Sequence, residues 1–169
     1  MANVVLGHGP VPAEVMIVGE APGADEVDQG KPFVGKSGQF LTNALQDAGI
    51  NRETCYITNV VKFRPEGNRT PTKEEVIAGW PLMVDELMDV KPKFILLLGA
   101  IPLWAFSGGT TNITQAHGTR IARQLPGDPY IFASYHPAAM MYKPALRTDF
   151  FGDIKTFGEI VNGEYNIGA

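Results

Sequence analysis

Carboxylate, amide and imidazole side chains occur in this chain where they could act together on one flat, polar substrate. Glu20, Asp25 and Glu26 lie in a Gly/Pro-rich turn after an apolar run, and Asn59 and His136 follow later apolar runs. A carboxylate can orient water or stabilise a developing cation, and an imidazole can donate a hydrogen bond to a developing oxyanion. An asparagine side chain both donates and accepts, which suits the edge of a nucleobase. The set predicts cleavage of a bond between a base and a sugar.

An aromatic ring and an apolar tip extend this set. Phe33, in the loop after the acidic turn, could stack on a flat base. A later segment carries an apolar tip between two prolines, with Ala138, Met140 and Met141 at its centre and Lys143 beside them. Such a tip could enter a duplex and occupy the hole that a flipped base leaves.

Four apolar runs of strand length alternate with segments of helical spacing. The predicted strands are Val15–Val18, Cys55–Val61, Phe94–Leu98 and Tyr130–Ser134. The predicted helices are Phe40–Ala48, Thr72–Met88 with a capping box between Thr72 and Glu75, Ile101–Phe106 and Arg147–Val161. Strands that alternate with helices imply right-handed crossovers and a parallel sheet covered on both faces. We therefore expect one domain over residues 1–169, with an α/β, three-layer α/β/α fold around a central four-stranded parallel sheet.

The predicted topology brings the polar residues together. In a parallel sheet the carboxyl ends of the strands share one edge, where open α/β sheets bind their ligands. The acids, the amide and the imidazole follow the first, second and fourth predicted strands, so they should converge on one cleft. Because desolvating three carboxylates is costly, the acidic turn is expected to be a functional loop rather than a buried structural one.

Composition limits the class of protein. The 169 residues are 44% hydrophobic and 19% charged, which is typical of a globular domain. No run approaches the roughly 18 apolar residues of a membrane span, and the first residues lack the pattern of a signal peptide. The single cysteine, Cys55, excludes an internal disulfide and a structural zinc or iron–sulfur site, and favours a reducing cytoplasm. We expect neither a metal nor a cofactor.

The distribution of charge leaves the partner open. A net charge of −4 mildly disfavours nucleic acid. Basic side chains nevertheless fall in predicted loops, namely Lys36, Lys62, Arg64, Arg69 and Lys143. A local basic face that contacts DNA is one interpretation and scattered solubilising charges are the other, and the pattern favours neither.

Four motifs together resemble the uracil-DNA glycosylase superfamily, most closely its family-four enzymes, in order and spacing over roughly residues 13–160. They are Gly19–Gly23 followed by Lys31–Gly35, then Thr58–Pro65, Gly67–Pro71 and His136–Ala139. The resemblance implies a uracil-DNA glycosylase-like fold and a monofunctional enzyme of base excision repair. Such an enzyme hydrolyses the N-glycosidic bond of deoxyuridine and leaves an abasic site. The implied partner is uracil-containing DNA, single- or double-stranded, bound by a monomer.

The resemblance also implies roles for single residues. Phe33 would stack on extrahelical uracil and Asn59 would read its polar edge. His136 would stabilise negative charge on the leaving base. The loop at Ala21 would lie near the C5 carbon of uracil and select against thymine. Ser37, with the N-terminus of the following helix, would contact a phosphate.

The acid that assists hydrolysis is left open. Glu20 and Glu26 stand at positions that are acidic in the family, and would hold the hydrolytic water or balance the oxocarbenium sugar. Asp25 competes for the same role, because the acidic run differs here from the glutamate-rich run of the family. Glu20 has an alternative role, bracing the loop by accepting backbone amides.

The chain departs from family four in its cysteines. Those enzymes hold an iron–sulfur cluster with four cysteines, whereas Phe63 and Gly79 stand at two of these positions here and Cys55 matches none. The sequence predicts a cluster-free relative in which packing of Phe63 and Trp80 holds this region. A related branch traps DNA covalently through a histidine in an inserted loop. No histidine occurs between residues 62 and 71, so turnover is expected.

Other functions remain open. One is a broader mismatch or deaminated-base glycosylase, and another is a non-catalytic binder of uracil-containing or single-stranded DNA. A nucleotide hydrolase is disfavoured, because Gly35-Lys36-Ser37 lacks the glycine spacing of a phosphate-binding loop. Each key residue also has a structural interpretation: Asn59 as a turn or cap residue, His136 as a hydrogen-bonded strand end, and Phe33 as core.

Overall fold

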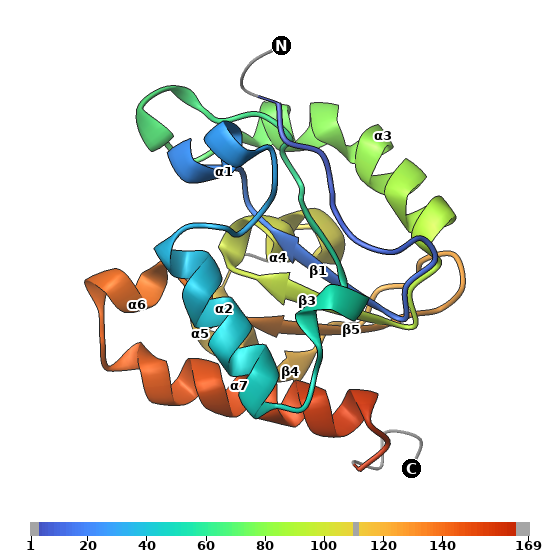
Figure 1. The fold of residues 1–169 in the computed structure, drawn as a ribbon. Helices are drawn as coiled ribbons and strands as arrows, with labels where there is room; N and C mark the ends of the chain where they lie inside the picture. Colours follow the sequence, from blue (N-terminus) through green and yellow to red (C-terminus); the bar gives the residue numbers. More distant parts are fainter. Residues whose placement is uncertain (1–3, 110–111, 165–169) are drawn as a thin grey trace.

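The computed structural model describes residues 4–109 and 112–164, arranged around one sheet (Figure 1). The strands are β1 (Val15–Gly19), β2 (Tyr56–Asn59), β3 (Phe94–Leu98), β4 (Thr119–Arg120) and β5 (Tyr130–Ser134). Their order in the sheet is β2-β1-β3-β5-β4. β1, β2, β3 and β5 are parallel, which confirms the predicted core of the sheet. β4 adds an antiparallel pair at the edge of β5 that was not predicted, because two residues are too short for a periodic pattern.

The second strand is shorter than predicted, since it ends at Asn59 instead of Val61. The chain still follows β1 beyond this point: the amides of Val60 and Val61 donate to the carbonyls of Gly19 and Glu20, at 3.0 and 3.1 Å. These bonds tie the loop after β2 to the acidic loop after β1. The two loops are therefore held in one place relative to each other.

Four longer helices cover the two faces of the sheet and form the outer layers (Figure 1). They are α2 (Lys36–Asp47), α3 (Lys73–Val90), α4 (Ala100–Ser107) and α7 (Leu146–Val161). α2 and α7 pack on the face that carries Ile17 and Leu96, and α3 and α4 pack on the face that carries Met16 and Leu97. Because both faces are covered, the strands are continuously apolar instead of alternating. Each large side chain that is fully buried here contributes about 1.5–3 kcal/mol.

The helix boundaries show which signals were sufficient. α3 begins where the capping box predicted: the Thr72 hydroxyl accepts from the Glu75 amide at 3.1 Å, and the Glu75 carboxylate accepts from the Thr72 amide at 2.9 Å. α2 begins at Lys36, earlier than the predicted Phe40. A Cβ at Gly38, in this first turn, would lie 2.0 Å from the Phe33 carbonyl oxygen. The glycine is therefore needed for a close approach inside the first turn.

Short helices occupy three of the segments expected to be loops. They are α1 (Ala24–Gln29), α5 (Ile113–Ala116) and α6 (Ala139–Tyr142), with 3-10 turns η1 (Arg52–Thr54) and η2 (Glu66–Asn68). α1 lies inside the acidic turn, where the Glu26 carboxylate accepts a hydrogen bond from the Gly23 amide at 2.9 Å. This contact caps the helix without the serine or threonine that would have signalled it.

The segment before β1 lies along the outer edge of β2. Val4 and Phe63 form one antiparallel bridge, and His8 and Ile57 form another. The Val5 amide donates to the Lys62 carbonyl at 2.7 Å. None of the helices in the described part of the chain is long and apolar enough to cross a membrane.

Candidate active site

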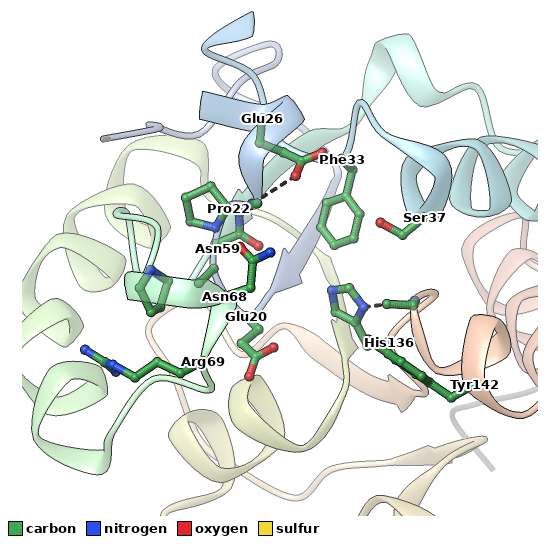
Figure 2. A pocket seen from close by; sticks show the side chains of 14 residues that line it. Glu20, Pro22, Glu26, Phe33, Ser37, Asn59, Asn68, Arg69, His136 and Tyr142 are labelled. Atoms are coloured by element: carbon green, nitrogen blue, oxygen red, sulfur yellow. Dashed lines mark hydrogen bonds between the residues drawn. The ribbon is translucent and has the colours of Figure 1, made fainter. Parts of the chain in front are cut away.

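A pocket of about 230 Å³ opens at the carboxyl ends of β1, β2 and β5 (Figure 2). Its lining comes from the loops after these strands, from the start of α2, from η2 and from α6. The lining residues are Glu20, Ala21, Pro22, Gly23, Glu26, Phe33, Ser37, Asn59, Pro65, Asn68, Arg69, His136, Ala138 and Tyr142. The predicted convergence of acid, amide, imidazole and aromatic ring at one sheet edge is thus found.

Asn59 presents an unsatisfied hydrogen-bond acceptor. Its side chain is 3% exposed, and its Oδ1 atom is buried without a hydrogen-bond partner among the described residues. A buried polar atom left unpaired costs about 1–3 kcal/mol. Gly19 makes room for this amide, because a Cβ there would lie 2.5 Å from Oδ1 and 2.5 Å from the tip of the Phe33 ring. Asn59 Oδ1 is therefore free to accept a hydrogen bond from a group that enters the pocket.

Phe33 is held in a strained backbone conformation beside Asn59. Its φ angle of 52° lies in the left-handed region, which for a bulky residue costs on the order of 1–3 kcal/mol. The side chain is 4% exposed, and its ring centroid lies 5.4 Å from that of His136, with 31° between the ring planes. A flat ring that entered the pocket would meet the Phe33 ring beside it (Figure 2).

His136 is a neutral hydrogen-bond donor in this environment. The backbone amide of Ala138 donates to Nδ1 at 3.1 Å, so the ring proton resides on Nε2. Burial lowers the pKa of His136 to about 4, and the nearby Glu26 carboxylate opposes this shift only in part. At neutral pH the imidazole therefore presents a neutral N–H, able to donate to an anion without itself changing charge.

The three acids of the turn occupy different environments. Both Glu26 oxygens accept backbone hydrogen bonds, from Gly23 at 2.9 Å and from Val34 and Gly35 at 3.0 Å each. Glu20 lines the pocket without a side-chain hydrogen bond to any described residue, and burial raises its pKa. The structure thus gives Glu26 the bracing position that the sequence offered to Glu20.

Asp25 does not reach the pocket. It lies exposed on α1, next to the backbone of Gly35, and does not belong to the lining. The expectation that Asp25 competes for the role at the reacting centre is not supported by this placement. The reason is the helix itself, because successive residues of α1 point in different directions.

The predicted DNA contacts divide into two groups. Ser37, Arg69 and Ala138 line the pocket, whereas exposed or half-exposed Lys36, Arg64, Met141 and Lys143 surround it without lining it. The Arg69 guanidinium bonds the Glu75 carboxylate at 2.5 Å and lowers the pKa of that carboxyl to about 2.

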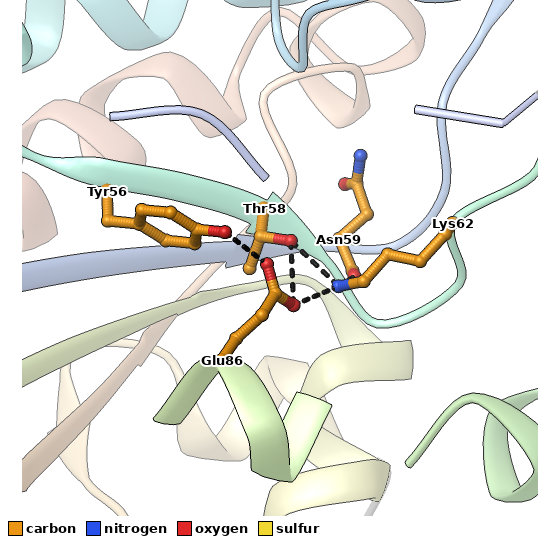
Figure 3. Close-up of polar contacts among 5 residues, drawn as sticks. All are labelled: Tyr56, Thr58, Asn59, Lys62 and Glu86. Atoms are coloured by element: carbon orange, nitrogen blue, oxygen red, sulfur yellow. Dashed lines mark hydrogen bonds and ion pairs between the residues drawn. The ribbon is translucent and has the colours of Figure 1, made fainter. Parts of the chain in front are cut away.

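The prediction that Lys62 contacts DNA is wrong, because this side chain is buried (Figure 3). Its Nζ atom pairs with Glu86 on α3 and donates to the Thr58 hydroxyl, at 2.7 Å, and to the Asn59 carbonyl. The Tyr56 hydroxyl donates to the same Glu86 carboxylate at 2.6 Å. Burial lowers the pKa of Lys62, while Glu86 opposes the shift. The partner lies 24 residues away in the chain, so no local pattern could have revealed it.

The apolar tip is also only partly as predicted. Met140 is 2% exposed and packs into the core under α6, so it is not available as a wedge. Met141 is 49% exposed, and Tyr142 is 83% exposed and lines the pocket. Sequence analysis missed Tyr142, Pro65 and Asn68 as pocket residues. Pro65 and Asn68 lie in the family motifs, and Tyr142 lies in the apolar tip segment that follows His136. This proximity is the one signal in the sequence that could have indicated them as pocket residues.

The residues present do not fit an iron–sulfur cluster. Cys55 is the one cysteine of the chain, and burial raises its pKa to about 11. A Cβ at Gly79 would lie 2.8 Å from the Val60 carbonyl oxygen, so even a small side chain there requires a shift. Among the described residues, no group of three or more histidine, cysteine or acidic side chains could hold a metal ion.

The region of the missing cysteines is held differently from the prediction. Trp80 packs edge-on against Phe106, with ring centroids 5.1 Å apart. Phe63 is 37% exposed and is not among the side chains packed against the buried cluster that Trp80 joins, so the predicted packing of Phe63 is not found. Its backbone instead pairs with Val4, and this pairing ties the N-terminal segment to the loop after β2.

Comparison with known proteins identifies the family of this chain. Residues 6–155 match the family model described as the uracil DNA glycosylase superfamily. A type-4 uracil-DNA glycosylase of Pyrobaculum aerophilum is 42% identical over an alignment covering 92% of this chain and 82% of the relative. Those of Archaeoglobus fulgidus and Sulfurisphaera tokodaii are 40% and 38% identical, over 94% of this chain and 82% and 74% of the relatives. The chain belongs to the uracil-DNA glycosylase superfamily.

Proposed function

We propose that this protein is a monofunctional uracil-DNA glycosylase that acts as a cytoplasmic monomer on uracil-containing DNA. The observation that carries the proposal is the buried, unpaired Oδ1 of Asn59 between Gly19 and Phe33. The N3–H of uracil is a donor that matches this acceptor, and the amide nitrogen of Asn59 can donate to the O4 atom of the base. The names of the relatives, type-4 uracil-DNA glycosylases, support the same substrate.

The pocket residues can assist each stage of hydrolysis. With the flipped base stacked on Phe33, the bond between C1′ and N1 breaks and its electron pair passes to the uracil ring. The Nε2–H of His136 donates to the O2 atom of the base, where negative charge develops. The Glu20 carboxylate balances the cationic sugar or orients the water that attacks C1′. The water oxygen then bonds to C1′, and the water proton ends on the released uracil.

The function is tested by multiple-turnover assays on an oligonucleotide with one uracil, in the presence of a chelator. Asn59→Ala and His136→Ala are expected to lower kcat/KM by at least about 100-fold, the scale of lost stabilisation of developing charge. Asn162→Ala, at the C-terminal cap of α7 and outside the pocket, serves as the matched control with wild-type rates.

The outcomes separate the competing functions. Abasic product in excess over enzyme, lost in both pocket variants, supports the proposal. Tight binding of uracil-containing DNA without product would make the protein a non-catalytic binder. Equal turnover of paired hypoxanthine or mismatched thymine would make it a broader glycosylase.

A further inference from the structure

The strained Phe33 backbone needs an explanation outside the residue itself. A φ angle of 52° is rare for a bulky side chain and persists only where the surroundings impose it. On the side of the pocket, the Glu26 carboxylate fixes the amides of Val34 and Gly35, which follow Phe33. The carbonyls of Pro32 and Phe33 are held by a different side chain, which does not line the pocket.

Arg52 takes up these carbonyls from outside the pocket. Its Nη2 donates to the Phe33 carbonyl at 2.6 Å and to the Pro32 carbonyl at 3.1 Å. Its Nη1 donates to the Gly38 carbonyl at 3.2 Å and to the Thr42 hydroxyl at 2.7 Å. One side chain on η1 thereby connects the strained residue to the first turns of α2.

The shape of the guanidinium is what makes this clamp possible. Two planar nitrogens of Arg52 serve acceptors on both sides of the bend, whereas a lysine ammonium is a single point charge on a flexible stem. Gly38 brings α2 so close that a Cβ would lie 2.0 Å from the Phe33 carbonyl oxygen. At this close approach Arg52 donates to the carbonyls of both Phe33 and Gly38.

We infer that Arg52 is a positioning residue for base recognition: it holds the Phe33 ring where a flipped nucleobase stacks. This inference rests on the proposed function, because the base is the ligand that Phe33 would receive. Arg52 itself does not line the pocket and touches no substrate. Any effect of Arg52 on catalysis is therefore indirect, and the inferred route is through Phe33.

A double-mutant cycle on wild-type, Arg52→Met, Phe33→Ala and the double variant tests this route. Arg52→Met is expected to lower kcat/KM about tenfold, because a displaced ring loses alignment with the base. In the Phe33→Ala background the same change should have less than about a twofold effect, since residues that act through one another are not additive. A merely structural Arg52 would give the same loss in both backgrounds, and that result would overturn the inference.

Further measurements keep the test decisive. Arg120→Met is the matched control, because Arg120 stacks on Tyr130 at the far edge of the sheet and should leave kcat/KM unchanged in both backgrounds. If Arg52→Met does not fold, Arg52→Lys takes its place in the cycle. Its loss of kcat/KM should be smaller than that of Arg52→Met and should occur only when Phe33 is present. Crystal structures of wild type and variant should show Phe33 leaving the left-handed region when Arg52 is replaced, and an unchanged Phe33 backbone would refute the inference.

These readouts separate the inference from the proposed function. An inactive wild-type protein would refute the glycosylase function, and the crystal structures would still decide whether Arg52 fixes Phe33. An active wild type with additive losses would refute the positioning role alone.

Discussion

The protonation state of His136 sets the expected pH dependence of the reaction. Burial lowers its pKa to about 4, and burial raises the pKa of Glu20, whose charged form is the one required. His136 is therefore in its neutral, working form at neutral pH, and both groups become protonated as the pH falls. The profile of kcat/KM should therefore decline on the acid side. A decline centred near 6.5, the ordinary histidine value, that persists in Glu20→Gln would contradict a neutral His136.

At the level of single residues, the sequence was informative where the backbone alone dictates position. Asn59 ends β2 and His136 lies two residues beyond the end of β5, so the parallel sheet brings them to one edge. The roles of Glu20 and Glu26 could not be separated, because these depend on which carboxylate meets the amides of the next loop. The burial of Met140 could not be predicted either, because it depends on α6, a single helical turn that directs this side chain into the core.

The Lys62–Glu86 pair joins the loop after β2 to α3 (Figure 3). Lys62→Met leaves Glu86, 13% exposed, without its cation, and an uncompensated buried charge costs about 3–5 kcal/mol. We expect a loss of this size in urea unfolding, and a smaller loss in Lys62→Met combined with Glu86→Leu. If Lys62 lay on a DNA-binding surface instead, the variant would weaken DNA binding with little change in stability.

At the level of elements, the sequence predicted those helices and strands that carry a local signal, such as a capping box or an apolar run. The capping box fixed the start of α3, and apolar runs fixed the four parallel strands. α1 was missed because its cap is a carboxylate that reaches back to Gly23, inside a segment rich in glycine and proline. β4 was missed because two residues are too short for a periodic pattern, and it is defined only by its pairing with β5.

Affinity for DNA should depend on salt through the exposed cations around the pocket, despite the net charge of −4. Lys143 lies one residue after the pocket residue Tyr142 and is exposed. Lys143→Ala should reduce the slope of log affinity against log salt by about 0.7–0.9, the value for one lost phosphate contact. Lys155→Ala, exposed on α7, should leave the slope unchanged. Equal slopes in both variants and wild type would place the DNA path elsewhere.

The segment that runs beside β2 has a consequence for the behaviour of the protein in solution. β2 is the outermost strand of the sheet, and an open strand edge is a template for pairing with other chains. His8 and Ile57 exchange two backbone hydrogen bonds, and the Val5 amide donates a hydrogen bond to the Lys62 carbonyl. The segment before β1 thus covers the open edge of β2. Resistance to edge-to-edge aggregation therefore depends on a few residues that take no part in the chemistry.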